Sequence, residues 1–487
     1  NYAVIYKKQG KDPNEKKMTK PEITPIITNR DVTSPFLVEV QESAVKPIEP
    51  VFLDYQKDMS QLKAKSDIPV LYKQNVANDL FQLIYVFDMG NNHDKALGTA
   101  FDYLEYLGTS DMTPEELKSE FYRLACTFYV SPGNERTYVV LSGLNENMPA
   151  AVQLFEKLLA DAQVNKEAYT NMTSDILKAR SDAKLNQGQN FSRLMSFAMY
   201  GPKSPATNLL TEAELTNMNP QELVDRIHNQ NSYKHRILYY GPSSSKDLLA
   251  TINQYHQVPA ALKDIPAGNE YSYLETPVTK VLVAPYDAKQ IYMAQISNLD
   301  KKYDPAIEPI RALYDEYFGG GMNSIVFQEM RETRGLAYSA WASIMPPSYL
   351  KYPYVLRTQI ATQNDKMIDA VTTFNDIINN MPESEAAFKL AKDGLTNRLR
   401  TERIIKGDII WSYINAQDLG QNVDPRIKLY NDIQNMSLKD IVDFQKQWVK
   451  GRTYVYCILG DKKDLELDKL KAVGPIEELT QEQIFGY

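Results

Sequence analysis

The feature that most constrains this chain is an internal repeat with a spacing close to 219 residues. Matching segments occur in the same order in both halves, and several ordered matches are far less expected by chance than one. The matched pairs are Ala-Val-x-x-Phe at 151–155 and 370–374, Asn-Met at 217–218 and 435–436, the apolar runs that end at Gly241 and Gly460, and Gly108-Thr109 with Gly319-Gly320. A chain of 487 residues is also too long for one hydrophobic core. We therefore predict two diverged copies of one domain of roughly 200 residues.

Within the first copy, strand-like and helix-like patterns follow one another, which indicates an α+β fold. Predicted strands cover 68–72, 80–89, 137–142 and 236–240, and predicted helices cover 93–107, 112–126, 149–160, 166–185 and 217–228. The last of these strands closes the copy, and its counterpart before Gly460 closes the second copy.

A proline-rich segment precedes the repeat. Proline at this density interrupts regular structure and favours an extended chain, so we predict a linker at 9–66. The first α+β domain is then 67–265 and the second is 266–487. Tyr2–Tyr6 resembles the strand that closes each copy. Residues 1–8 are therefore predicted to be the closing strand of a missing upstream domain, in a larger parent protein with at least three such units.

Composition argues against several classes of protein. A net charge of -8 and a pI near 5.4 disfavour nucleic acid or an anionic membrane as a partner, and no apolar run approaches the roughly 18 residues of a membrane-spanning helix. Cys126 and Cys457 are predicted to be two buried thiols, because they form neither a disulfide framework nor a zinc ribbon. The histidines lack any metal-ligand spacing and are predicted to be surface or packing residues; they are His93, His228, His235 and His256.

The most distinctive stretch of the sequence is 319–339, which begins with three glycines. Glycine allows unusual backbone conformations and close approach of neighbouring backbone. Asn323 or Ser324 is a suitable N-cap for a short helix, and Gly335 is expected to end that helix before a strand at 336–344. The turn lacks the Gly-Lys-Ser/Thr ending of a phosphate-binding loop, and no Gly-x-Ser-x-Gly elbow is present.

Two side chains in this stretch are expected to meet. Arg331 ends the helix on its polar side, and Tyr338 opens the strand seven residues later. A guanidinium and a phenol at one helix–strand corner can both reach one bound group. In the bland alternative, Arg331 pairs with Glu329 or Glu332 of its own helix while Tyr338 packs.

The Gly-Gly-Gly-Met-Asn-Ser segment, followed by Arg331 and by Tyr338 in a Gly-Leu-Ala-Tyr-Ser context, resembles the pitrilysin/insulinase family of zinc metallopeptidases. The resemblance covers the whole chain by domain order, with its specific motif confined to 319–339. It implies two homologous α+β domains, each a mainly antiparallel sheet flanked by helices, as in the mitochondrial processing peptidases. It also implies a peptidase of two halves. The active half carries zinc on a His-x-x-Glu-His helix, and the partner half supplies an Arg and a Tyr to the chamber.

The resemblance also locates the position of the zinc helix. In the family this helix stands just before a Gly-Thr pair, which here is Gly108-Thr109, so 99–103 aligns with His-x-x-Glu-His. Thr99 and Tyr103 replace the two histidines, and Asp102 has no metal-bound water to activate. We therefore expect no zinc in this chain and no activity from it alone. Zinc is expected in the missing catalytic half.

Arg331 and Tyr338 are expected, by the same resemblance, to bind substrate and assist catalysis, and Gly319, Gly320 and Gly321 to belong to the substrate-binding turn. Donors aimed at the scissile carbonyl oxygen stabilise the negative charge that develops there, at about 3–4 kcal/mol each. Counting from Met112, in step with Met322, places Phe121 and Phe128 at the equivalent positions of the first copy. The segment 340–344 is a candidate sheet edge for peptide addition, the family's way of holding substrate.

The sequence therefore predicts the C-terminal, non-catalytic half of a zinc-dependent endopeptidase, which closes the chamber and contacts the peptide. Its expected partners are the N-terminal catalytic half, or a separate catalytic subunit, and a peptide substrate. The expected location is the bacterial periplasm or cell envelope. The rival prediction is a non-catalytic scaffold or binding protein that kept the fold and lost the chemistry.

Overall fold

The computed structural model describes residues 2–6, 34–44, 46–288 and 290–487. The chain divides into two compact units, Asn1–Ile48 and Glu49–Tyr487. In the first unit the described residues form one helix, α1 (Pro35–Glu42), which Ser34 caps. Residues 2–6, predicted as a strand, have no regular secondary structure, and 7–33 of the predicted linker lie outside the described residues.

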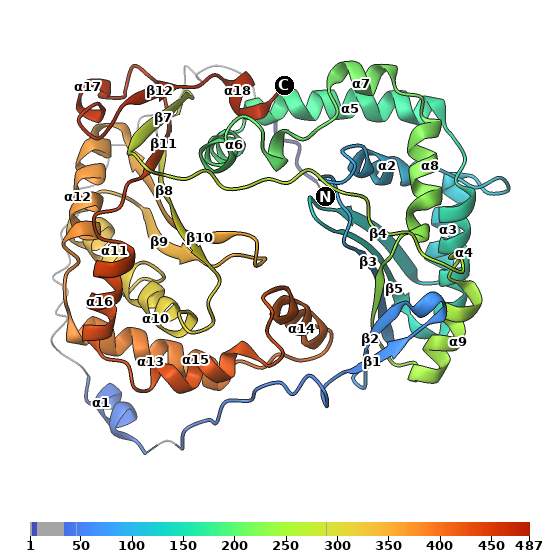
Figure 1. The fold of residues 1–487 in the computed structure, drawn as a ribbon, viewed down its shortest axis with the longest axis horizontal. Helices are drawn as coiled ribbons and strands as arrows, with labels where there is room; N and C mark the ends of the chain where they lie inside the picture. Colours follow the sequence, from blue (N-terminus) through green and yellow to red (C-terminus); the bar gives the residue numbers. More distant parts are fainter. Residues whose placement is uncertain (1, 7–33, 45, 289) are drawn as a thin grey trace. The chain divides into compact units, whose positions relative to one another are not determined.

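The second unit contains two six-stranded sheets, so the predicted α+β fold with two similar domains is confirmed (Figure 1). In the first sheet the strand order is β1-β2-β6-β3-β5-β4, and every pair is antiparallel except β2 with β6. The strands are β1 (Ser60–Lys63), β2 (Pro69–Gln74), β3 (Leu80–Phe87), β4 (Cys126–Pro132), β5 (Thr137–Leu144) and β6 (Arg236–Gly241).

Two boundaries in this domain differ from the sequence prediction. β1 lies inside the segment predicted as linker, because Leu62 and the buried Ala64 pack against the core of the first domain. The helix predicted over 112–126 ends at Arg123 instead. Ala125 has a φ of 49°, a left-handed conformation that stops a helix, and Cys126 then begins β4.

The second sheet has the order β12-β7-β11-β8-β10-β9. β7 runs parallel to both β11 and β12, and the other pairs are antiparallel. Its strands are β7 (Lys280–Pro285), β8 (Gln290–Lys302), β9 (Ser339–Met345), β10 (Pro353–Gln363), β11 (Val455–Gly460) and β12 (Ile476–Glu478). In each sheet one edge strand belongs to a hairpin, β4 in the first sheet and β9 in the second.

Helices cover one face of each sheet and form its main core. Helices of the first domain are α2 (Leu97–Leu104), α3 (Pro114–Arg123), α4 (Met148–Asp161), α5 (Lys166–Lys184), α7 (Glu212–Asn217), α8 (Gln221–Asn229) and α9 (Ser245–Tyr255). Helices of the second are α10 (Glu308–Phe318), α11 (Ile325–Phe327), α12 (Met367–Asn379), α13 (Glu385–Thr401), α15 (Pro425–Ile433), α16 (Leu438–Trp448), α17 (Leu467–Leu470) and α18 (Gln481–Phe485).

The two domains exchange one helix each. α6 (Gln187–Tyr200), from the first half of the chain, packs Phe191 and Leu194 on the second sheet. α14 (Asp408–Asp418), from the second half, packs Ile410 and Ile414 on the first sheet. The predicted division at 265/266 follows the chain, but these helices cross it in space. The exchange buries apolar side chains on the sheet faces that the other helices leave uncovered.

Ion pairs reinforce this exchange where a β-hairpin meets α14. Arg136, in the turn between β4 and β5, donates to both carboxylate oxygens of Asp418 at 2.6 Å and to Asp88 at 2.6 Å. Lys351 and Tyr352 of the second domain contact Glu135 at 2.9 and 3.1 Å. Arg136 and Asp418 are mostly buried, so these contacts are screened less than surface pairs.

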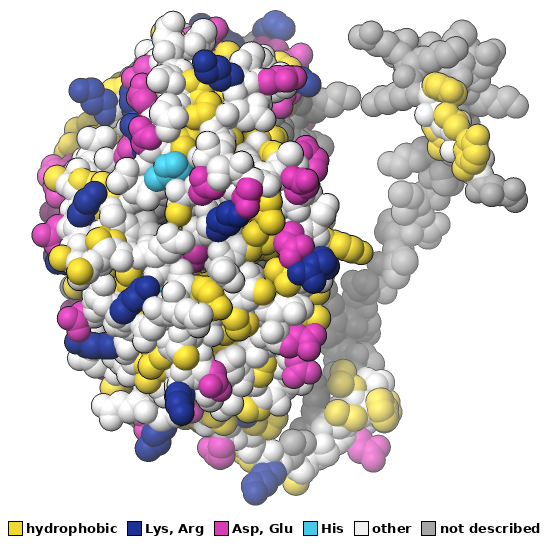
Figure 2. Space-filling view, turned by 90° about the vertical axis from the view of Figure 1, so that its right-hand side faces the viewer, with side chains coloured by type: hydrophobic (Ala, Val, Ile, Leu, Met, Phe, Trp, Pro, Cys, Tyr) yellow, Lys and Arg dark blue, Asp and Glu magenta, His cyan; other side chains and the backbone are white. Residues whose placement is uncertain are grey.

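The face in Figure 2, formed by outer helices of the first domain, mixes charges of both signs. Lysine and arginine side chains are interspersed there with aspartate and glutamate. Among the described residues, no helix is long and apolar enough to span a membrane.

Candidate functional site

The glycine-rich turn lies directly after α10 and is pressed against β9. An added Cβ at Gly319 would lie 2.3 Å from the carbonyl oxygen of Ala342, and one at Gly320 would lie 2.8 Å from that of Asp315. Gly321 has open space around it. The close approach expected of the glycines therefore holds at the first two positions, while none of the three adopts a positive φ.

A short helix follows the turn and changes its winding. Ser324 is the N-cap, and its hydroxyl accepts from the Phe327 N–H at 3.4 Å. After α11 the chain widens into a π-helical turn, η5 (Gln328–Thr333), a rare geometry that often occurs at functional sites. Gly335 then ends the helix with a φ of 55°, as predicted. This π-helical turn carries Arg331.

Arg331 and Tyr338 meet, as predicted. The Arg331 guanidinium carbon lies 4.8 Å from the centre of the Tyr338 ring and 4.9 Å from that of Phe327. Such cation–π stacking holds the guanidinium plane while leaving its edge N–H groups directed outward. Tyr338 is 75% exposed. Within the described part of the chain, its hydroxyl makes no hydrogen bond.

The bland alternative for Arg331 is only weakly realised. Glu329 is bound to Arg334 at 2.7 Å, so it does not pair with Arg331. The nearest Glu332 oxygen lies 3.6 Å from Arg331 Nε, too far for a hydrogen bond, and both side chains are more than a third exposed. An exposed pair of this kind contributes little to stability. Stacking on the two rings, rather than the carboxylate, therefore positions the guanidinium.

The equivalence proposed for the first copy is partly wrong. Phe121 and Phe128 do pack together, with ring centres 4.9 Å apart, inside the first core. The strand register shows, however, that Phe128 pairs with Leu141, while Ala340 pairs with Ile360, which lies 219 residues after Leu141. Phe128 therefore corresponds to Ala340, and Tyr338 corresponds to Cys126. Counting from the methionines missed a two-residue difference in the connection to the strand.

The candidate peptide-binding edge at 340–344 is already occupied by the protein itself. The Ile344 N–H donates to Asp315 Oδ1 at 2.9 Å, and its carbonyl accepts from Arg311 at 3.1 Å. The Ala342 N–H points at the Gly319 carbonyl, 3.4 Å away. These contacts cap the outward-facing backbone of β9 at both residues. An extended peptide cannot pair with β9 unless it displaces them.

The positions aligned with the zinc motif do not fit a metal. The Tyr103 hydroxyl donates to the Asn165 carbonyl at 2.6 Å and accepts from the Asn165 N–H at 2.8 Å, so a packing role explains it. Asp102 lies at the surface and Thr99 is half-buried. Within the described ranges, no three His, Cys, Asp or Glu side chains are arranged to hold a metal ion. No zinc chemistry can therefore be assigned to α2.

Two of the histidines belong to a buried polar network that the sequence did not reveal. His256 Nδ1 lies 2.6 Å from Glu156 Oε1, and His256 Nε2 lies 2.8 Å from His235 Nε2. His235 Nδ1 faces the Tyr233 carbonyl at 2.7 Å, so that nitrogen must carry the proton and donate it. The other Glu156 oxygen accepts from Asn231 and from the Gln257 N–H, each at 3.0 Å.

These partners fix the proton arrangement of the network. Because His235 Nδ1 is the donor, its Nε2 accepts from His256, and one further proton is shared between His256 and Glu156. Burial, and then the neighbouring His256, lower the pKa of His235 to about 3, so His235 is neutral at pH 7. All three side chains are buried. The network is structural, because no substrate can reach it.

The predicted buried thiols are confirmed. Cys126 and Cys457 are both free and buried. Burial raises the pKa of both thiols, that of Cys457 to about 12. Neither is therefore a thiolate near neutral pH, and neither is a candidate nucleophile.

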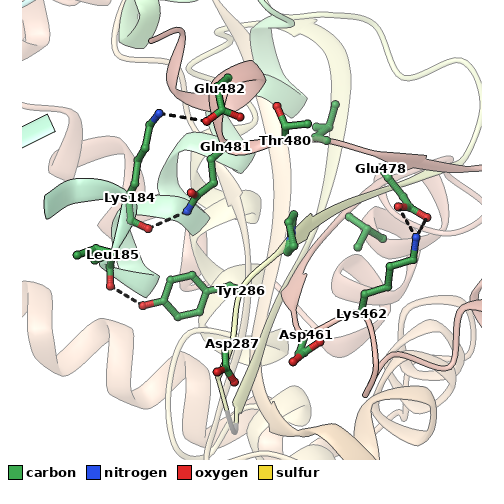
Figure 3. Close-up of a pocket in the computed structure, with 13 residues that line it drawn as sticks. Lys184, Leu185, Tyr286, Asp287, Asp461, Lys462, Glu478, Thr480, Gln481 and Glu482 are labelled. Atoms are coloured by element: carbon green, nitrogen blue, oxygen red, sulfur yellow. Dashed lines mark hydrogen bonds and ion pairs between the residues drawn. The ribbon is translucent and has the colours of Figure 1, made fainter. Parts of the chain in front are cut away.

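A cavity of about 800 Å³ lies away from Arg331 and Tyr338, at the carboxyl ends of the parallel strands β7, β11 and β12 (Figure 3). Its two lysines face acids: Lys184 lies 3.3 Å from Glu482, and Lys462 lies 2.7 Å from Glu478. The Tyr286 hydroxyl donates to the Leu185 carbonyl at 2.6 Å. The cationic groups are thus neutralised within the wall, which leaves no concentrated charge for a ligand.

Comparison with known proteins relates both the sequence and the fold to one family. Residues 237–395 match the family described as "Peptidase M16 inactive domain". A relative described as "Non-peptidase homolog YmxG", from Helicobacter pylori, is 23% identical over 422 residues, which are 82% of this chain and 93% of that protein.

Solved structures share the fold at low identity. The crystal structure of a peptidase M16 inactive domain from Pseudomonas fluorescens superposes with a TM-score of 0.64 at 15% identity, covering 83% of this chain and 98% of that one. The periplasmic protease PqqL from Escherichia coli superposes with a TM-score of 0.66 at 12% identity, covering 91% of this chain but 49% of that one. The chain is therefore a member of the pitrilysin/insulinase (peptidase M16) family, of the inactive, C-terminal-domain type.

Proposed function

We propose that this chain is the non-catalytic half of a zinc-dependent endopeptidase, and that it closes the peptide chamber and contacts the substrate through Arg331 and Tyr338. The observation that carries the proposal is the stacked, outward-facing pair on a π-helical turn. Neither polar end is committed to a close partner among the described residues, so both remain available to a peptide. The chain also matches about half of PqqL, a protein described as a periplasmic protease.

The pair suits the chemistry of peptide hydrolysis. A guanidinium fork binds carbonyl oxygens well, and a phenol O–H can donate to the same or a neighbouring oxygen. As the scissile carbonyl becomes an oxyanion, each correctly placed donor lowers the barrier by about 3–4 kcal/mol. Gly319–Gly321 shape the turn that presents the helix, with Gly320 and Gly321 exposed beside it. Zinc and the catalytic base belong to the other half. By analogy with PqqL, the assembly would act in the bacterial periplasm.

The test uses the assembled peptidase, made of this chain and a zinc-bearing half from the same organism. Arg331→Ala and Tyr338→Phe are each expected to lower kcat/KM by at least tenfold. Matched controls are Arg334→Ala, whose side chain pairs with Glu329, and Tyr122→Phe, an 87% exposed tyrosine of the first domain. Both controls should retain normal turnover. Unchanged kinetics in the Arg331 and Tyr338 variants would return both residues to a packing role.

A non-catalytic scaffold is the second candidate, and one observation favours it: the relative from Helicobacter pylori is described as a non-peptidase homolog. The two candidates differ in what the assembly does to a peptide. A scaffold would show neither cleavage nor zinc in any complex it forms, and its partner binding would be unaffected by Arg331→Ala. The purified chain alone is expected to contain no zinc by elemental analysis under either function.

A further inference from the structure

The edge strand of the first sheet, β4, directs every second backbone group away from the sheet. Two hydrogen bonds bracket its ladder with β5: Gly133 N–H to Arg136 O at 2.7 Å and Leu144 N–H to Ala125 O at 3.2 Å. Antiparallel pairs alternate, so the odd-numbered residues of β4 bond to β5 and the even-numbered ones face outward. The outward row therefore offers the N–H and C=O of Cys126, Phe128 and Val130, and the C=O of Pro132.

Unlike the capped edge of β9, this row has no partner. Within the described residues of Glu49–Tyr487, no backbone or side-chain group bonds to it. Val130 corresponds in register to Ala342, which faces Gly319, but the carbonyl of Gly108 instead accepts from the Gln163 N–H at 2.9 Å. The loop after α2 is thereby held to Gln163 and leaves Val130 uncovered.

The position that needs the strongest cap in β9 needs none in β4. Pro132 corresponds to Ile344, and proline has no N–H to satisfy. The remaining three donors and four acceptors alternate along the edge with the spacing of a β-ladder. An extended peptide backbone is the one partner whose own groups match such an array, whereas exposed unpaired edges are otherwise blunted in native sheets.

Side chains on the two faces of β4 define what such a peptide should carry. Phe128 and Val130 are only partly buried where they pack on the first core, so they form an apolar rim. Thr127, Tyr129 and Ser131 point to the opposite face, and Tyr129 is 49% exposed. A partner strand should therefore alternate apolar residues, which cover the rim, with polar or β-branched residues beside Tyr129.

We propose that β4 binds an extended peptide segment of about seven residues as an additional strand of the first sheet. The proposal does not depend on the proposed function, because β4 lies in the first domain and requires neither zinc nor Arg331. Specificity comes from the alternation of side chains, and affinity from up to seven backbone hydrogen bonds.

The first test uses the whole chain and the labelled peptide Lys-Thr-Val-Thr-Val-Thr-Val-Thr-Lys. Fluorescence anisotropy should show saturable binding. Hydrogen exchange read by mass spectrometry should show the amides of Cys126, Phe128 and Val130 slowed at least tenfold by the peptide. Those of Thr127 and Tyr129 are slow beforehand, because they already bond to β5. Equal protection of odd and even positions, or no binding, would overturn the proposal.

N-methylation of the peptide separates strand addition from simple apolar contact. One peptide is methylated on its valine amides and a second on its threonine amides. Only the amides that face β4 matter to a strand, so one peptide should lose at least tenfold in affinity and the other should bind normally. Equal losses would contradict pairing with β4.

Val130→Pro tests the same edge from the protein side. It removes an outward N–H and leaves the β5 ladder, so binding should weaken at least tenfold. Val130→Thr keeps the N–H and should bind normally. Thermal melting checks that both variants fold; if Val130→Pro does not, the methylated peptides decide. A dimer that Val130→Pro abolishes, with no peptide binding, would assign β4 to a second copy and overturn a peptide occupant.

Discussion

The two domains bury a polar network at the same point beneath their sheets, one charged and one neutral. Glu156 on α4 and Asn375 on α12 are 219 residues apart, at equivalent positions of the repeat. Glu156 contacts His256 in the first domain. Asn375 accepts from Gln295 and from the Tyr456 hydroxyl, at 2.6 and 2.7 Å, in the second. A fold of this kind thus requires a buried acceptor at this point but not a buried charge.

The edges of the two sheets show the reverse arrangement. The second domain places its titratable groups at the edge, where Arg311 and Asp315 cap β9. The first domain leaves the edge of β4 without charged caps. The comparison teaches that the copies diverged by moving ionisable groups between core and edge. Acid should therefore weaken the core of the first domain and relieve the edge of the second.

The largest expected effect comes from removing the buried acceptor of the first domain. Glu156→Ala should lower the free energy of unfolding by about 3–5 kcal/mol, because Asn231, Gln257 and His256 lose their common partner in a buried site. Glu156→Gln should be nearly neutral, since its amide can donate to His256 and its oxygen can accept from Asn231. Urea unfolding measures both.

The matched change in the second domain is Asn375→Ala. It should cost less, about 1–3 kcal/mol, because only neutral donors lose their partner. A cost as large as that of Glu156→Ala would contradict the view that charge distinguishes the two networks.

The second prediction concerns acid stability through His235. Its folded pKa of about 3 lies below the ordinary 6.5, so between these values the unfolded chain binds a proton that the folded chain does not. The stabilisation is present above pH 6.5 and is lost as the pH falls. From pH 6.5 to 4.5 the loss is about 3 kcal/mol, at about 1.4 kcal/mol per pH unit. His235→Gln should flatten this part of the stability profile, and a profile unchanged in this variant would assign the acid loss elsewhere.

Sequence alone predicted the elements whose signals are local. The repeat gave two α+β domains, Ser324 was among the two expected caps, and Gly335 ended its helix with a positive φ. Arg331 and Tyr338 were expected to meet because a helix and a strand only seven residues apart leave little freedom. Their contact with substrate stays a prediction.

What the sequence could not reveal depends on contacts between distant segments. Glu156 and His256 are 100 residues apart, and no spacing pattern links them. The caps of β9 come from α10, whose Arg311 and Asp315 resemble an ordinary helical ion pair in sequence. The exchange of α6 and α14 leaves no local trace either, because an amphipathic helix does not specify which sheet it covers.

The third prediction has the opposite sign and concerns Asp315. Burial raises the pKa of Asp315 to about 6, against the favourable effects of Arg311 and of the Ile344 N–H. Between pH 6 and its ordinary 3.8, the folded chain therefore holds a proton that the unfolded chain lacks, and stability rises as the pH falls. From pH 6 to 4.5 the gain is about 2 kcal/mol. Asp315→Asn should remove it, so that acid then destabilises the variant more than the parent chain. Equal acid responses would show that Asp315 ionises normally.

The smallest effect tests how closely the glycine turn holds β9. Gly319→Ala should destabilise by about 1–2 kcal/mol, because its Cβ would meet the backbone of Ala342 at 2.3 Å. Gly321→Ala, two residues later, meets nothing within 4 Å and should be neutral or slightly stabilising. Thermal melting compares the two variants, and hydrogen exchange at Ala342 should quicken only in the first. If both behave alike, the turn does not press on β9, and the difference between the capped edge of β9 and the open edge of β4 depends on Arg311 and Asp315 alone.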